Sequence, residues 1–167
     1  VFACRSEARA LAAIAKVRAE VPGLSEEALV FMQLDVSSLA SVLEFSEAFE
    51  RSGLELHVLI NNASSFYPTP LAQTDDNQWN DLINSNLKGP FFLCKELAPL
   101  LHASAGAIVN ISDMHARQAL KEHPIYSIAK AGNIAMTKSL ALELAPRVRV
   151  NSVAPGAILW PEHESDD

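Results

Sequence analysis

Short apolar runs alternate along this chain with longer stretches in which apolar residues recur every three or four positions. The runs predict strands at residues 1–4, 29–34, 56–60, 107–111 and 147–153. The longer stretches predict helices at residues 7–20, 39–49, 79–102 and 125–145, the third bent at Gly89-Pro90. Alternating strands and helices are typical of βαβ units. The sequence therefore predicts a single α/β domain, residues 1–167, built on a doubly wound parallel sheet.

Polar residues and turn residues follow four of the predicted strands. They are Asp35, Asn61-Asn62, Ser112-Asp113 and Pro155-Gly156. The carboxyl ends of parallel strands meet at one edge of a sheet, and ligands of open α/β sheets bind beyond that edge. We therefore expect these residues to surround a binding site.

Composition and charge narrow the class of protein. Apolar residues make up 49% of the chain, and 13 Lys and Arg stand against 20 Asp and Glu, a net charge of −7. An acidic chain is a poor match for nucleic acid, whose binding depends on neutralised phosphates. No apolar run approaches the roughly 20 residues that cross a bilayer, so no membrane partner is expected. Cys4 and Cys94 lie far apart, which predicts reduced thiols in a cytoplasmic protein and no metal site.

Tyr126 and Lys130 are the first candidates for chemistry. Residues four apart share one face of a helix, and an ammonium beside a phenol lowers the phenol pKa from about 10. A tyrosine tuned in this way can act as a general acid. On spacing alone, a surface Tyr and Lys on an amphipathic helix is the commoner explanation.

The residues around this pair strengthen the catalytic interpretation. Asn86, Asp113, Tyr126 and Lys130 stand in an order that resembles the catalytic set of the short-chain dehydrogenases/reductases. Asn61-Asn62-Ala63 and Pro155-Gly156 match the same family, and the resemblance covers nearly the whole chain. It implies a Rossmann-like fold, a small-molecule substrate and a nicotinamide cofactor.

The resemblance also implies a role for each residue. Tyr126 donates a proton to the substrate, Lys130 binds the nicotinamide ribose and lowers the Tyr126 pKa, and Asn86 holds a water in the proton relay. The implied cofactor contacts are Arg5, Ser6, Asp35, Asn61, Ala63, Ser64, Ser112, Lys130, Pro155 and Gly156. Arg5 favours NADP(H), because a guanidinium binds the 2′-phosphate in a bidentate manner. The alternative for Arg5 is a solvated residue at a helix entry.

Two departures from the common family pattern point to the pteridine reductases. Asp113 stands where most members carry Ser, and a carboxyl group suits a substrate with ring nitrogens. The segment 61–71 resembles the corresponding pteridine reductase loop, which places Phe66 to stack on a flat pterin. The alternative is that Phe66 and Tyr67 only pack the loop. The tail from Gly156 resembles dihydromonapterin reductases. The expected substrate-binding residues are Phe66, Asp113, Tyr126, Leu159 and Trp160.

The remaining histidines show no ligand spacing. Structural or solvent-facing roles are expected for His57, His102, His115 and His123. His115 lies two residues after Asp113, so an approach to the site is the alternative for it.

The expected function is NADPH-dependent reduction of a dihydropterin to a tetrahydropterin, with the proton from Tyr126 and Asp113. The alternatives are a carbonyl reductase of the same family and a catalytically inert nucleotide-binding fragment. The family begins with a strand and a Gly-rich turn, and no Gly-x-Gly pattern occurs among the six glycines here. We expect that strand to belong between residues 1–4 and 56–60, and the family's C-terminal strand to be absent too. These residues alone should therefore bind NADP poorly and show little activity. The family also implies a homo-oligomer, commonly a tetramer.

Overall fold

The computed structural model describes residues 1–156, apart from the side chain of Glu26. The predicted substrate contacts Leu159 and Trp160 lie outside the described residues. The main elements are β1 (Phe2–Cys4), α1 (Glu7–Glu20), β2 (Phe31–Gln33), α2 (Leu39–Arg51), β3 (Val58–Asn61), α3 (Asp76–Ile83), α4 (Gly89–Ala103), β4 (Ala107–Ile111), α5 (Pro124–Glu143) and β5 (Arg149–Val153). Short 3-10 turns are η1 (Glu26–Ala28), η2 (Leu71–Gln73) and η4 (Met114–Ala116).

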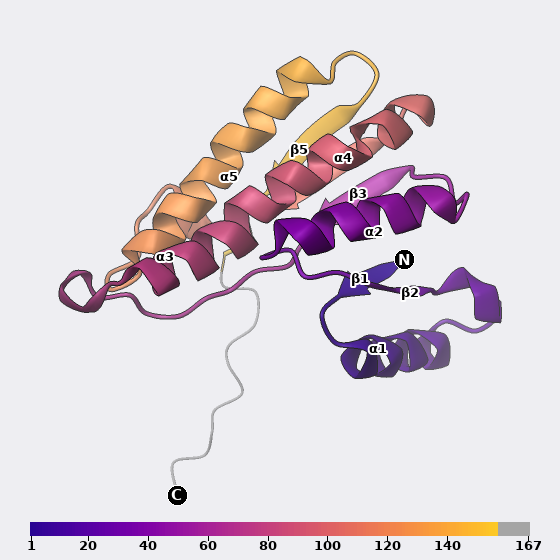
Figure 1. Ribbon diagram of the computed structural model, residues 1–167, viewed down its shortest axis with the longest axis horizontal. Helices are drawn as coiled ribbons and strands as arrows, with labels where there is room; N and C mark the ends of the chain where they lie inside the picture. The colour runs from indigo at the N-terminus through magenta and orange to yellow at the C-terminus, as the bar shows by residue number, and fades with distance from the viewer. Residues whose placement is uncertain (157–167) are drawn as a thin grey trace, which may run out of the picture.

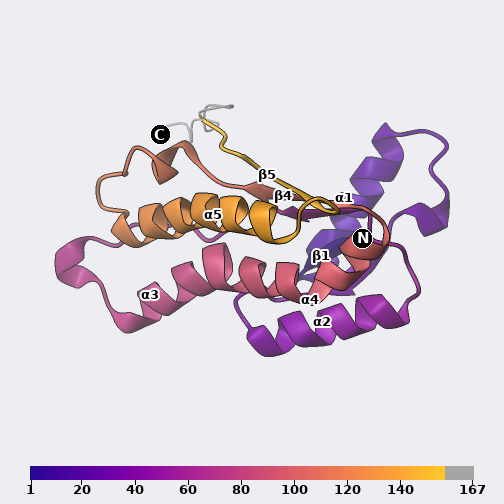
Figure 2. The ribbon, with the colours of Figure 1, turned by 90° about the horizontal axis from the view of Figure 1, so that it is seen from above.

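All strand pairs are parallel, as the alternating pattern predicts. β1 pairs with β2, and β4 lies between β3 and β5. Helices α2, α4 and α5 cover one side of the strands, and α1 lies on the other (Figures 1 and 2). The fold is therefore α/β and Rossmann-like, with helices on both faces of parallel strands.

No backbone ladder joins β1 to β3 among the described residues. Their facing edges line a groove of about 690 Å³, whose apolar wall includes Leu34 and Phe49. Val58 and Ile60 on β3 are 53% and 60% exposed. The groove lies where the family resemblance places a further strand.

The apolar core lies between the β3-β4-β5 sheet and the helices α2 and α4. Side chains that are at most a few per cent exposed include Val42, Leu93, Leu97, Leu101 and Ile108. Burying each such side chain contributes about 1.5–3 kcal/mol. This layer fixes the strands whose carboxyl ends carry the candidate site.

The predicted helix 79–102 differs from the structure at its start and in its middle. It begins at Asp76, because Asp75 and Gln78 form a capping box. A π-helical turn, η3 (Asn84–Lys88), then joins α3 to α4, and the Gly89 N–H donates to the Asn84 carbonyl oxygen. The irregularity was expected at Gly89-Pro90, and the structure places it just before these residues, as a π turn.

The other elements agree with prediction within two residues. Helix α1 has the predicted bounds, with Ser6 as its N-cap. Strands β2, β3 and β5 each begin two residues later than predicted. Strand ends depend on the neighbouring strand, which a single run of apolar residues does not specify.

Candidate active site

The carboxyl ends of β3, β4 and β5 meet at one edge. Asn61 is in register with Asn110, and Asn110 with Ser152. Beyond the strands, the Ser112 N–H donates to the Val153 carbonyl oxygen at 2.8 Å, and the Met114 N–H donates to that of Pro155 at 3.1 Å. The segments that the sequence singled out after these strands are therefore adjacent.

Tyr126 and Asp113 form the centre of this edge. The Tyr126 hydroxyl donates to Asp113 Oδ2 at 2.7 Å, and Asp113 Oδ1 accepts from the His115 N–H at 2.8 Å. Burial and the bonded carboxylate raise the pKa of Tyr126 above its ordinary value near 10. The expectation that Tyr126 has a lowered pKa is therefore wrong for this structure. Tyr126 keeps its proton at neutral pH, which suits a proton donor.

Lys130 lies one helical turn after Tyr126 and is buried. Its Nζ donates to the Ile111 carbonyl oxygen at 3.0 Å and lies 5.6 Å from the centre of the Tyr126 ring. Burial lowers the pKa of Lys130, while the Asp113 carboxylate acts in the opposite direction. Ser112 supports the helix by donating its hydroxyl to the Lys130 carbonyl oxygen at 3.3 Å.

Asn86 enters the site from the π turn. It is 1% exposed, and its amide donates to the carbonyl oxygens of Ser65 and Leu82, both at 2.9 Å. Asn86 Oδ1 accepts from the Ser64 hydroxyl at 2.6 Å. The nearby Ser64 hydroxyl counteracts part of the rise in the Tyr126 pKa. Ser64, predicted as a cofactor contact, thus lies beside the Tyr126 hydroxyl while it donates to Asn86.

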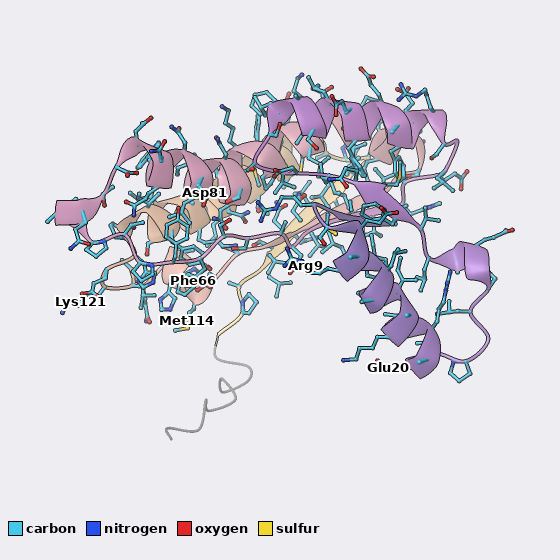
Figure 3. All side chains as sticks on the ribbon, turned by 60° about the horizontal axis from the view of Figure 1, so that its bottom comes forward. Arg9, Glu20, Phe66, Asp81, Met114 and Lys121 are labelled. Carbon is cyan, nitrogen blue, oxygen red and sulfur yellow. The ribbon has the colours of Figure 1, made fainter. Side chains whose placement is uncertain are left out.

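Phe66 forms an aromatic surface beside these polar groups. Its ring is 56% exposed, stacks on His123 at a centroid distance of 4.7 Å, and meets Tyr126 edge-on at 4.8 Å. Figure 3 shows Phe66 and Met114 at the same end of the molecule, on the segments that follow β3 and β4. The next residue, Tyr67, donates its hydroxyl to Asp81 on α3 at 3.0 Å. No ligand spacing marks His123 in the sequence, and its ring nevertheless lies against Phe66 at the site.

A second groove, of about 290 Å³, brings together half of the ten predicted dinucleotide contacts. It is lined by residues that include Arg5, Ser6, Asp35, Ala63 and Ser64. The N-terminus of α1 opens into the same region. Donors of this kind bind phosphate groups well, so the residues fit a dinucleotide.

Arg9 also lines this second groove, and the sequence analysis missed it. The signal was its position one helical turn after Arg5, at the start of α1. Figure 3 shows Arg9 at the end of α1 nearest the sheet, with Glu20 at the far end. Asp35 lines the groove while its Oδ1 accepts hydrogen bonds from the Ser37 N–H and hydroxyl.

The Asn61 side chain faces the interior of the protein. Its amide donates to Asn110 Oδ1 at 2.8 Å and to Cys94 Sγ at 3.2 Å. Asn110 in turn donates to the Thr137 hydroxyl at 2.9 Å. The Asn61 amide therefore ties β3 to β4 and α5 beneath the site, a role that the sequence analysis did not foresee. Burial raises the pKa of Cys94 to about 11.

Two further findings concern metal sites and membrane-spanning helices among the described residues. Across residues 1–156, no cluster of three or more His, Cys, Asp or Glu side chains forms a metal site. In the same part of the chain, no helix has the length and apolar character needed to span a membrane.

Comparison with known proteins agrees with this geometry. The family model of the short chain dehydrogenases matches residues 1–165. The chain is 36% identical over 158 residues to a trans-4-hydroxycyclohexanecarboxylate dehydrogenase of Sinomonas cyclohexanicum, covering 93% of this chain and 60% of that protein. It is also 36% identical over 127 residues to pteridine reductase 1 of Leishmania tarentolae, covering 63% and 44% of the two chains.

A solved structure of the same kind has a closely similar backbone. It is an NADPH-bound short chain oxidoreductase of Pseudomonas aeruginosa PAO1, with an atypical catalytic center. The TM-score is 0.80 at 29% identity, and the match covers 92% of this chain and 59% of that one. The chain spans less than two thirds of the length of all three proteins. The match of the family model over residues 1–165 and these similarities show that the chain belongs to the short-chain dehydrogenase/reductase family, whose members are oxidoreductases that use nicotinamide cofactors.

Proposed function

We propose that the protein carrying this chain uses NADPH to reduce a dihydropterin to a tetrahydropterin. The observation that carries the proposal is the hydrogen bond of 2.7 Å between the Tyr126 hydroxyl and Asp113 Oδ2, beside the half-exposed ring of Phe66. A linked hydroxyl and carboxyl can deliver a proton to a ring nitrogen. An aromatic face beside them suits a flat heteroaromatic substrate.

The residues of this chain hold and move the proton. When bound, NADPH supplies the hydride that reduces a carbon of the substrate's C=N bond. Tyr126 retains its proton at neutral pH because burial and Asp113 raise its pKa, and it donates that proton to the neighbouring nitrogen. Ser64 lies beside the Tyr126 hydroxyl and donates to Asn86 Oδ1, and Asn86 is proposed to hold the water that returns a proton to Tyr126. Lys130 places a positive charge beside Tyr126 and stabilises the phenolate that forms.

The second groove supports NADP(H) as the cofactor. Arg5 and Arg9 both line it, at the N-terminus of α1. Two guanidinium groups favour a cofactor with an extra phosphate over one without. Pro155 and Gly156, which follow β5, are proposed to approach the nicotinamide. A homotetramer is proposed from family membership.

A carbonyl reductase is the second candidate. It is favoured by the 93% coverage of this chain in the match to a cyclohexanecarboxylate dehydrogenase, against 63% for the pteridine reductase. Tyr126 and Lys130 serve a ketone as well as a C=N bond. Asp113 and Phe66 are the residues that separate the two functions.

The test compares substrates in the natural protein that carries this chain. Loss of NADPH absorbance is followed with dihydrobiopterin, with dihydromonapterin and with a cyclohexanone carboxylate. We expect turnover of a dihydropterin, and a Tyr126→Phe variant should lose about 10²–10⁴ in kcat on every substrate, since it lacks the general acid.

The Asp113→Ser variant separates the candidates further. It should lose about 10²-fold or more on the pterin and keep ketone reduction, because a hydroxyl suffices to orient a carbonyl. If the unmodified protein reduces only the ketone, the pterin proposal is wrong.

A further inference from the structure

We propose that His123 is a positioning residue that fixes the plane of the Phe66 ring and thereby the affinity for a flat substrate. The inference rests on the proposed function, because it assigns Phe66 to substrate stacking. The imidazole of His123 lies nearly parallel to the Phe66 ring, with an interplanar angle of 10° and centroids 4.7 Å apart.

Two neighbouring rings define the orientation of Phe66. His123 covers one face, and Tyr126 meets the ring edge-on at 75° and 4.8 Å. Phe66 is still 56% exposed as a residue, so we assign the opposite face of its ring to the substrate. Stacked and edge-on contacts of this kind add to affinity beyond simple burial. A ring held on one face and at its edge needs little ordering when a ligand arrives on the other face.

His123 is itself held firmly by the backbone around it. Its N–H donates to the Leu120 carbonyl oxygen at 3.2 Å, and its Nδ1 lies 2.9 Å from the Lys121 carbonyl oxygen. The preceding residue, Glu122, has a φ of +62°, in the left-handed region that non-glycine residues rarely adopt. Pro124 directly follows and opens α5. The side chain is therefore placed by a constrained segment on both sides.

The same segment is tied to the loop that carries Phe66. The Thr69 N–H donates to the Glu122 carbonyl oxygen at 2.6 Å, and Thr69 is fully buried. A left-handed conformation at a non-glycine residue is strained and persists only where its surroundings enforce it, often at functional sites. Here the unusual Glu122 backbone connects the two loops and turns His123 toward Phe66. That connection accounts for the strained residue in terms of the site.

The test measures binding and turnover in the natural protein with His123→Ala and His123→Phe. Binding of a diaminopteridine, a flat ligand, is titrated, and KM and kcat are measured with dihydrobiopterin. Loss of one stacked ring predicts a roughly three- to tenfold rise in Kd and in KM for the alanine variant, with kcat changed less than about twofold. His123→Phe keeps a ring and should restore both constants to within about twofold.

A double-mutant cycle tests whether His123 acts through Phe66. In a Phe66→Ala background, adding His123→Ala should change the diaminopteridine Kd by less than about twofold. His102→Ala, which removes a histidine remote from the site, is the matched control. Circular dichroism and thermal unfolding identify any variant that misfolds; if His123→Ala misfolds, His123→Leu, which removes the ring but keeps most of its volume, replaces it and is expected to raise Kd and KM in the same way.

Each result has a definite meaning. An unchanged Kd in His123→Ala, a lowered Kd, or equal losses in the alanine and phenylalanine variants would overturn the proposal; a lowered Kd would mean that the imidazole occupies the substrate's own face. Failure of the unmodified protein to bind the diaminopteridine overturns it as well. If the ligand binds as expected but no dihydropterin is reduced, the proposed function fails and the role of His123 stands.

Discussion

Asn110 is the residue whose removal the structure predicts to be most costly beneath the site. It is fully buried in β4, accepts from the Asn61 amide at 2.8 Å and donates to the Thr137 hydroxyl at 2.9 Å. In Asn110→Ala, the Asn61 amide keeps only the weak sulfur acceptor of Cys94 at 3.2 Å. The Thr137 hydroxyl still donates to the Asn133 carbonyl oxygen at 2.8 Å, so its loss is smaller.

The magnitude follows from these contacts. A buried donor left without a good acceptor costs about 1–3 kcal/mol. The small cavity left by the amide group adds about 1 kcal/mol. The free energy of unfolding should therefore fall by about 3 kcal/mol in Asn110→Ala. Urea unfolding of the natural protein, followed by far-ultraviolet circular dichroism, measures this change as a shift in midpoint at constant slope.

The matched control is Asn80→Ala. Asn80 also donates its amide to a side chain, the Asp76 carboxylate at 2.8 Å, but it lies exposed on α3. This variant should stay within about 0.5 kcal/mol of the unmodified protein, as exposed substitutions usually do. A loss below about 1 kcal/mol in Asn110→Ala, or equal losses in the two variants, would refute the reasoning from burial.

The remaining predictions concern packing and the loop. Gly89→Ala should destabilise the protein by more than about 2 kcal/mol, since its Cβ would collide with the Val36 backbone. Gly132→Ala should cost less, because its Cβ meets only the movable Leu87 side chain at 2.7 Å; thermal unfolding of both variants checks the order. Tyr67→Phe removes a hydrogen bond that helps raise the Tyr67 pKa to about 12. It should raise the substrate KM a few-fold without lowering kcat, and an unchanged KM would contradict this.

Local signals in the sequence were enough to predict the elements that depend on local chemistry. Helix α1 has the predicted bounds because Ser6 caps its start and Pro22-Gly23 follow its end. Tyr126 and Lys130 share a helix face because they lie four residues apart on α5. The meeting of Asp113 with Tyr126 was implied by the resemblance to the short-chain dehydrogenases/reductases, because Tyr126 lies in the first turn of α5 and not at the end of a strand.

Features that depend on distant contacts were not predictable. The π turn before Gly89 lies where that glycine packs against the backbone of Val36, more than fifty residues earlier in the chain. His123 showed no ligand spacing, and it faces Phe66 because Glu122 adopts a left-handed conformation and binds the Phe66 loop. The raised pKa of Tyr126 reflects burial, which a spacing argument between two residues does not contain.

The groove between β1 and β3 has a consequence for cofactor affinity. Arg5, Ser6 and Asp35 belong to the β1-β2 side of that groove, whereas Tyr126 and Lys130 belong to the β3-β4-β5 side. Among the described residues, no ladder fixes the distance between the two sides. A dinucleotide that contacts both sides therefore binds only those molecules in which this distance matches its length. The apparent Kd is then the intrinsic Kd divided by the fraction of such molecules. A strand paired with the facing edges of β1 and β3 would raise the fraction of molecules that can bind. It would thereby tighten cofactor binding without contacting the cofactor.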